Sequence, residues 1–136
     1  MTNITGSCLC GNLRYTVRSD PVLTGICHCK SCQKQTGAAF GVAIVVPKSS
    51  LSIEGDLASF EVVGASGLPT RRVFCPKCGS PIAVDPNSNP NITFISAGTL
   101  DDTSWLKPTV QQWCESAQPW VHISAETQNF PKGMPG

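Results

Sequence analysis

The sequence predicts a mainly β protein that forms a single domain over residues 1–136. Gly and Pro are frequent, with 12 and 11 copies, and charged residues make up only 14% of the chain. This composition favours short strands joined by turns over long helices. Strand-length apolar or alternating segments also follow one another along the chain. A chain of 136 residues is long enough for one hydrophobic core and too short to divide comfortably.

The expected strands are short. The clearest alternation of apolar and polar residues covers residues 12–18, and the most apolar strand covers residues 39–46, directly before Pro47. A hairpin turn is expected at residues 54–57, where Gly and Asp separate two strands. A short helical turn is expected at residues 31–36. The other expected strands cover residues 22–27, 51–53, 59–63, 71–74, 82–84, 92–97, 110–114 and 120–124.

Charge and hydropathy exclude several classes of protein. The formal net charge is +1, so no strong positive field favours nucleic acid or an anionic membrane as a partner. The N-terminus, MTNITGSCLC, has neither the basic nor the apolar region of a signal peptide. The longest apolar run, AFGVAIVV, is far too short to span a bilayer. We therefore expect a cytoplasmic protein with no membrane and no nucleic-acid partner.

Eight cysteines in such a chain require an explanation. Clustered cysteines in a reducing compartment are more often metal ligands than disulfides. Cys-x-Cys occurs twice, as Cys8-Leu-Cys10 and Cys27-His-Cys29, and cysteines so close in sequence rarely bridge each other without strain. The pattern therefore favours zinc over a disulfide framework.

The segment Cys75-Pro-Lys-Cys78-Gly has the chemistry of a zinc knuckle. Two thiolates separated by two residues bind one ion when the chain turns tightly between them. Pro76 presets this turn, and Gly79 supplies a positive φ just after it. A knuckle provides two ligands, so a second pair has to complete the site.

Cys8 and Cys10 are the best candidates for the second pair. Residues i and i+2 of an extended chain point to the same face, so both thiols can reach one ion. Together with the knuckle they complete a closed tetrahedral site, which would hold a structural zinc that contributes to folding. The predicted ligands of this structural zinc are Cys8, Cys10, Cys75 and Cys78.

A third group of cysteines remains within six positions: Cys27, Cys29 and Cys32. In an extended chain His28 points away from the cysteine face, so it is a poor ligand for the same ion. Cys114 or His122 could complete the site from far along the sequence. Such isolated residues are more often buried or hydrogen-bonded than metal-bound. Spacing alone does not decide which pairs share an ion, although four ligands plus three is the simplest division.

The sequence resembles the family of glutathione-dependent formaldehyde-activating enzymes, which also includes centromere protein V. The motifs that carry the resemblance occur in the family's order along nearly the whole chain. They are GSCLCG at residues 6–11, CHCKSC at 27–32, TGAAF at 36–40, FCPKCGS at 74–80, SAGTLDD at 96–102, KP at 107–108 and QPW at 118–120.

The resemblance implies an Mss4-like fold of several small antiparallel sheets organised around zinc. It implies two zinc ions per chain, with the same division of ligands. The four-cysteine site is structural, whereas Cys27, Cys29 and Cys32 hold a reactive zinc and are the catalytic residues. The fourth position of that zinc belongs to water or a substrate thiol. The implied substrates are a small aldehyde such as formaldehyde and a thiol such as glutathione.

The chemistry of an open three-cysteine zinc site is consistent with this implication. Zinc with three thiolates carries a net charge of −1 and is a weak Lewis acid, yet it can hold a substrate thiol as thiolate. A thiolate beside an aldehyde carbonyl attacks it and forms a carbon–sulfur bond. We therefore expect a carbon–sulfur lyase similar to S-(hydroxymethyl)glutathione synthase. The alternative is a non-catalytic, zinc-stabilised thiol carrier or binding module.

Other residues carry weaker signals. Four basic residues are candidates for binding the carboxylates of a peptide thiol, although each alone is more typical of a solvated surface charge: Lys30, Lys34, Arg71 and Arg72. Three tryptophans are expected in the core or in a pocket wall: Trp105, Trp113 and Trp120. Gly37 and Phe40 are expected to pack after the metal loop. The tail at residues 129–136 is expected to be extended or loose.

Overall fold

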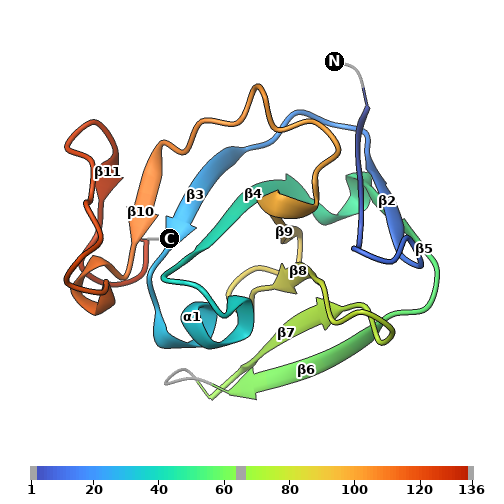
Figure 1. Cartoon of the computed structure of the whole chain (residues 1–136), viewed down its shortest axis with the longest axis horizontal. Coiled ribbons are helices and arrows are strands. Elements are labelled where there is room, and N and C mark those ends of the chain that lie inside the picture. Colours follow the sequence, from blue (N-terminus) through green and yellow to red (C-terminus); the bar gives the residue numbers. More distant parts are fainter. Residues whose placement is uncertain (1–2, 64–66, 135–136) are drawn as a thin grey trace.

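The computed structural model describes residues 3–63 and 67–134, and it confirms a mainly β protein (Figure 1). The one α-helix of the described chain, α1 (Lys30–Thr36), lies where the helical turn was expected. The strands are β1 (Ile4–Ser7), β2 (Arg14–Val17), β3 (Leu23–Cys27), β4 (Gly41–Pro47), β5 (Leu51–Glu54), β6 (Ala58–Val63), β7 (Pro69–Phe74), β8 (Pro81–Asp85), β9 (Ile92–Ser96), β10 (Val110–Gln112) and β11 (Gln128–Asn129). Short 3-10 helices are η1 (Lys48–Ser50), η2 (Ala97–Thr99) and η3 (Cys114–Ser116).

The strands form a three-stranded sheet, in the order β1-β2-β5, and an eight-stranded sheet, in the order β11-β10-β3-β4-β9-β8-β7-β6. Most neighbours are antiparallel, as expected, but β10 is parallel to both β3 and β11. Parallel strands need a long crossover connection. The segment between β9 and β10, residues 97–109, provides it and passes the ends of β3 and β4, which lie between those two strands (Figure 1).

The predicted hairpin at residues 54–57 is wrong. β5 pairs with β2 in the small sheet, whereas β6 pairs with β7 in the large one. Gly55 has φ +106°, and a Cβ atom there would lie 2.0 Å from the carbonyl oxygen of Asn12. This tight turn therefore packs against the chain before β2 and directs the two flanking strands into different sheets. Turn residues indicate where the chain reverses, but they do not choose the partner of each strand.

The C-terminal third differs from the expectation in two places. Residues 120–124 form no strand, and Trp120 is 73% exposed, so its prediction as core or pocket wall is wrong. The tail is not loose up to residue 134. The backbone N–H groups of Trp113 and Cys114 donate to the carbonyl oxygens of Lys132 and Phe130, each at 3.0 Å. The last two residues of the predicted tail, and the first two of the N-terminal segment, lie outside the described residues.

The hydrophobic core packs the small sheet against the large one. Val17 of β2 and Ile44 of β4 are fully buried within it. Two cysteines, Cys8 and Cys75, belong to the same cluster of buried residues. The core therefore continues directly into the first cysteine group. No helix in the described part of the chain has the length and apolar character needed to cross a membrane.

Candidate metal centres

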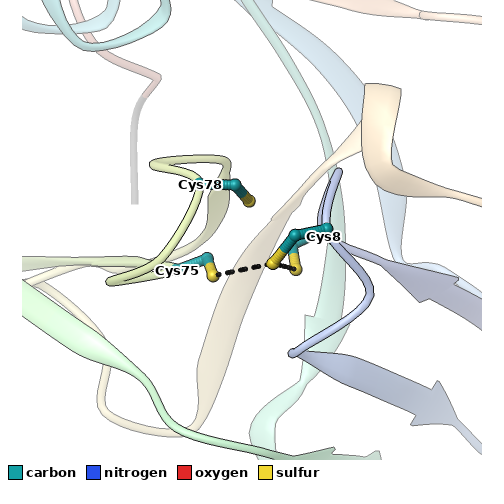
Figure 2. Close-up of side chains that lie close together, drawn as sticks. Cys8, Cys75 and Cys78 are labelled. Carbon is teal, nitrogen blue, oxygen red and sulfur yellow. Dashed lines mark hydrogen bonds between the residues drawn. The ribbon is translucent and has the colours of Figure 1, made fainter.

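The first cysteine group joins two segments that are far apart in the sequence. Cys8 and Cys10 follow β1, and Cys75 and Cys78 follow β7. The Sγ atoms of Cys8 and Cys10 are 3.6 Å apart, and those of Cys10 and Cys75 are 3.7 Å apart. Figure 2 shows Cys8, Cys75 and Cys78 with their sulfur atoms turned toward one another. All four candidate ligand atoms lie within 4.8 Å of one another.

These distances fit a tetrahedral zinc site. A Zn–S bond of about 2.3 Å places the sulfur atoms of a tetrahedral site about 3.8 Å apart. The observed separations of 3.6 and 3.7 Å are close to this value and far too long for a disulfide. The structure therefore brings together the four cysteines that the sequence predicted as one closed site. Cys10 is exposed, so this group lies at the surface end of the core.

The local backbone donates hydrogen bonds to thiols of this group. The N–H groups of Leu13 and Lys77 donate to the Sγ atoms of Cys8 and Cys75, at 3.2 and 3.3 Å. Gly79 has φ +80°, as predicted for the residue after the knuckle. Hydrogen bonds from the side chain and the backbone of Ser80 lower the pKa of the Cys78 thiol to about 5. A thiolate is the form of cysteine that binds a metal ion.

Cys8 and Cys10 occupy a turn, where an extended segment was expected. The N–H of Gly11, which has φ +81°, donates to the carbonyl oxygen of Cys8 at 3.2 Å. The two thiols therefore meet because the chain turns around them, in the same way as the knuckle does. The expected pair is present, but the local geometry that forms it is different.

The second cysteine group is formed where β3 passes into α1. Cys27 is the last residue of β3, Cys29 caps the N-terminus of α1, and Cys32 lies in its first turn. Their Sγ atoms lie within 4.8 Å of one another, and all three residues are partly buried. The backbone N–H of Cys32 donates to Cys29 Sγ at 3.3 Å. Hydrogen bonds with the thiols of Cys27 and Cys32, aided by the charge of Arg72, lower the pKa of the Cys29 thiol.

This second group has three candidate ligands. Among the described residues, no further His, Cys, Asp or Glu joins it within the same 4.8 Å. Neither Cys114 nor His122, which the sequence left open as a fourth ligand, belongs to the group. Three thiols with no fourth protein ligand fit an open metal site, in which one position accepts water or substrate.

His28 does not face the thiols. It is fully buried, its Nε2 atom lies 2.7 Å from Gln111 Oε1 of β10, and its ring packs edge-on against Phe40. Gln33 of α1 donates to the carbonyl oxygen of His28 at 2.7 Å and to that of Ser116 at 3.0 Å. These buried contacts hold the loop between β3 and α1 in place. His28 therefore stabilises the cysteine loop through buried contacts and not as a metal ligand. Phe40 packs against the His28 ring, after the cysteine loop, as expected.

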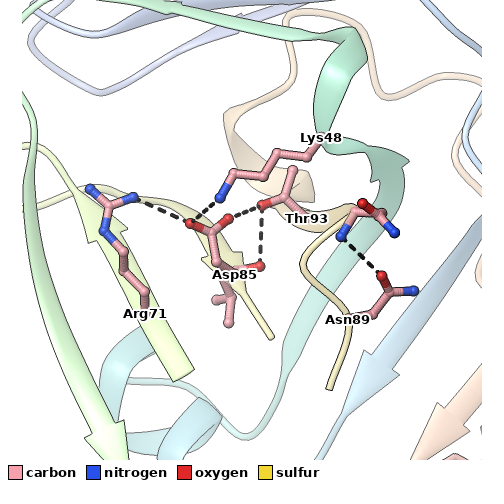
Figure 3. Close-up of polar contacts among 7 residues, drawn as sticks. Lys48, Arg71, Asp85, Asn89 and Thr93 are labelled. Atoms are coloured by element: carbon pink, nitrogen blue, oxygen red, sulfur yellow. Dashed lines mark hydrogen bonds and ion pairs between the residues drawn. The ribbon is translucent and has the colours of Figure 1, made fainter. Parts of the chain in front are cut away.

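From the sequence, Arg71 and Arg72 were equivalent candidates for binding carboxylates, but in the structure they have different partners. Arg71 forms an ion pair with Asp85 at 3.2 Å, in a polar cluster that Lys48 and Thr93 complete (Figure 3). Burial raises the pKa of the Asp85 carboxyl, but its hydrogen bonds from Thr93, Lys48 and Arg71 outweigh that effect and lower it overall. Arg71 therefore has a structural partner away from the cysteines.

Arg72 points to the opposite face of β7 and is only 8% exposed. Its Nη2 atom lies 3.7 Å from Cys32 Sγ, and its Nη1 atom donates to Gln35 Oε1 at 2.8 Å. Residue spacing alone did not identify Arg72 as a neighbour of the second cysteine group, because the contact joins residues 40 positions apart. Lys30 and Lys34 are exposed, as expected for solvated charges.

The fold and the two thiol groups define a cysteine-rich β protein with one closed and one open candidate metal site. Residues 3–116 match the family model described as glutathione-dependent formaldehyde-activating enzyme. The chain belongs to this family.

Curated relatives that carry the same family name support the assignment. A protein of Aspergillus flavus is 29% identical over 107 residues, covering 74% of this chain and 55% of the relative. A protein of Phaeosphaeria nodorum is 26% identical over 132 residues, covering 92% of this chain and 69% of the relative. The chain thus spans about half the length of the Aspergillus protein.

A solved structure supports the fold. A Rhodobacter sphaeroides protein of known crystal structure superposes with a TM-score of 0.58 at 20% sequence identity. The match covers 71% of this chain and 87% of the other chain. At this level of identity the comparison concerns the fold alone.

Proposed function

We propose that this protein is a zinc-dependent enzyme of the carbon–sulfur lyase type, which acts on adducts between a glutathione-like thiol and a small aldehyde such as formaldehyde. The observation that carries the proposal is the open group of three thiols, Cys27, Cys29 and Cys32, within 4.8 Å of one another. Membership of the glutathione-dependent formaldehyde-activating family supports the thiol and the aldehyde as substrates.

The proposed site uses the chain's residues in simple roles. Cys27, Cys29 and Cys32 hold the ion, and their partial burial leaves a side open to solvent. When bound there, zinc supplies a positive centre that keeps a thiol in its thiolate form near neutral pH. The buried contacts of His28 and Gln33 keep the three thiols converged. Such preorganisation is needed for a metal site to orient a substrate.

The proposed reaction balances without an oxidant or a reductant. The S–H bond of the thiol breaks, the sulfur electron pair forms a C–S bond to the aldehyde carbon, and the carbonyl oxygen gains the proton. The product is a hemithioacetal, which for formaldehyde is the S-hydroxymethyl derivative of the thiol. The reverse reaction cleaves the same C–S bond. A thiolate is the reactive form of the nucleophile, so a site that favours the thiolate accelerates both directions.

Turnover tests the proposal against the thiol-carrier alternative. We expect zinc-loaded protein to accelerate the formation of S-(hydroxymethyl)glutathione from glutathione and formaldehyde, measured by NMR as exchange between free and adduct signals. Protein treated with a chelator and dialysed is the control. An exchange rate equal to that in buffer, even at stoichiometric protein concentration, would contradict an enzymatic role.

We also propose that Cys8, Cys10, Cys75 and Cys78 bind a second, structural zinc, and that the protein is cytoplasmic, where reducing conditions keep its thiols free. We expect native mass spectrometry to show two zinc ions per chain. The ion of the three-cysteine group should leave first during titration with a chelator, because it has one protein ligand fewer. A single ion per chain in the presence of excess zinc would rule out the two-site arrangement.

A further inference from the structure

Arg72 is a buried cation with no carboxylate partner. The ion pairs found among the described residues join Asp85 to Lys48 and to Arg71, and neither involves Arg72. Its Nη1 atom bonds the neutral side chain of Gln35, and its Nε atom is buried without a hydrogen-bond partner. A buried charge is costly unless an opposite charge lies nearby. The Sγ atom of Cys32 lies 3.7 Å from Nη2, and it would meet this requirement as a thiolate of the proposed zinc site.

We infer that Arg72 is a positioning residue that sets the charge of the three-cysteine site and makes it favour an anionic ligand, a thiolate, over a neutral one. The inference rests on the zinc site of the proposed function. Three thiolates and one Zn²⁺ ion carry a net charge of −1, which the guanidinium of Arg72 brings to zero. A thiolate that joins this site therefore meets no net negative charge, whereas without Arg72 it would meet one.

The charge of Arg72 reaches the three-cysteine site from a strand that lies outside the cysteine loop. Arg72 lies on β7, opposite Phe60 of β6 and Val84 of β8, and Gln35 of α1 holds one of its terminal nitrogens. Cys75 of the closed site follows three residues later on the same segment. The closed site thus fixes the end of the strand that carries Arg72. A positive charge acts strongly over a few ångströms in a partly buried site, because water screens it poorly there.

Arg71 provides a matched control. It is the preceding residue on the same strand, carries the same charge, and faces Asp85 on the other side of the sheet. Replacing either arginine by Met removes one positive charge and retains an unbranched apolar stem of similar shape. Only the Arg72→Met change removes the charge beside Cys32. Arg72→Lys keeps the charge and loses the planar fork.

The test is a ligand titration of cobalt-loaded protein. Cobalt(II) replaces zinc and reports its sulfur ligands through a charge-transfer absorption band. 2-Mercaptoethanol serves as the thiolate probe and imidazole as the neutral probe. We expect Arg72→Met to weaken binding of 2-mercaptoethanol by about 10- to 100-fold, the range expected for a hydrogen bond to a charged group. Imidazole affinity should change by less than about twofold, since a neutral ligand gains little from Arg72.

The variants separate charge from structure. Arg72→Lys should recover most of the thiolate affinity, and Arg71→Met should match the unmodified protein with both probes. Equal 2-mercaptoethanol affinity in Arg72→Met and unmodified protein would overturn the inference. So would an equal loss of affinity for both probes, because that result indicates a distorted site and not a missing charge.

Failure of the proposed function has a different signature. If unmodified cobalt protein binds no thiol, the proposed function and the preference for a thiolate are both wrong, and metal retention then decides whether Arg72 sets the charge of the site. Under competition with a chelator, Arg72→Met should release the ion of the three-cysteine group at about a tenfold lower chelator concentration than Arg71→Met, because an uncompensated negative site is less stable. Identical release curves would overturn the role of Arg72.

Discussion

Replacing Cys32 by Ala should reduce adduct formation by at least about 100-fold and leave the protein folded. Removing groups that only orient metal ligands typically costs 10- to 100-fold, so loss of a ligand itself should cost at least the upper end. The backbone N–H that Cys32 donates to Cys29 Sγ is retained in the variant, so α1 should still begin at the same residue. Circular dichroism and the NMR exchange assay measure the two expectations.

Cys114→Ala is the control for this experiment. Cys114 is also a partly buried free thiol, but it belongs to neither cysteine group. We expect it to retain full activity and two zinc ions per chain. If Cys32→Ala kept its activity, or if Cys114→Ala lost as much activity, the three-cysteine group could not be the site of the reaction.

Replacing Cys78 by Ala should instead unfold the protein or lower its melting temperature by tens of degrees. The closed group lies at the end of the core, and Cys75 within it is fully buried. Structural zinc contributes roughly 10–16 kcal/mol to folding in small zinc-binding peptides, whereas a domain is stable by only about 5–15 kcal/mol in total. Loss of one of four ligands therefore removes a large fraction of the stability.

Comparing Cys32→Ala with Cys78→Ala distinguishes the open site from the structural one. Thermal melts followed by circular dichroism, with zinc counted by native mass spectrometry, should show Cys32→Ala folded with one zinc ion. They should show Cys78→Ala largely unfolded at the temperature at which Cys114→Ala is intact. A Cys78→Ala protein that melts like the unmodified one would refute a structural role for the closed group.

Several features were predictable because they depend on neighbours in the sequence. The alternation around Tyr15 indicated a strand, and β2 lies there. The Cys-Pro-Lys-Cys-Gly segment indicated a knuckle, and Gly79 has the positive φ that this turn requires. Both depend on the spacing of a few consecutive residues. The predicted hairpin failed because a turn such as that at Gly55 does not encode the distant strand with which each of its arms pairs.

The surroundings of the open group depend on contacts over long sequence distances. Residues 72 and 111 reach the segment of residues 27–33 from two other strands of the large sheet. Arg71 and Arg72 look alike in sequence. Side chains alternate along β7, so the two arginines lie on opposite faces. Arg71 pairs with Asp85 on one face, and Arg72 lies beside Cys32 on the other.

The sequence by itself determined the mainly β class and the closely spaced cysteine motifs from which the two groups are built, because strand periodicity and the spacing of neighbouring ligands are local properties of the chain. The tertiary structure decided the rest. It chose the partner of each strand, excluded Cys114 and His122 from the open group, and brought a buried arginine to it. These outcomes depend on which distant segments share a core, and that is decided by packing and hydrogen bonding over the whole chain.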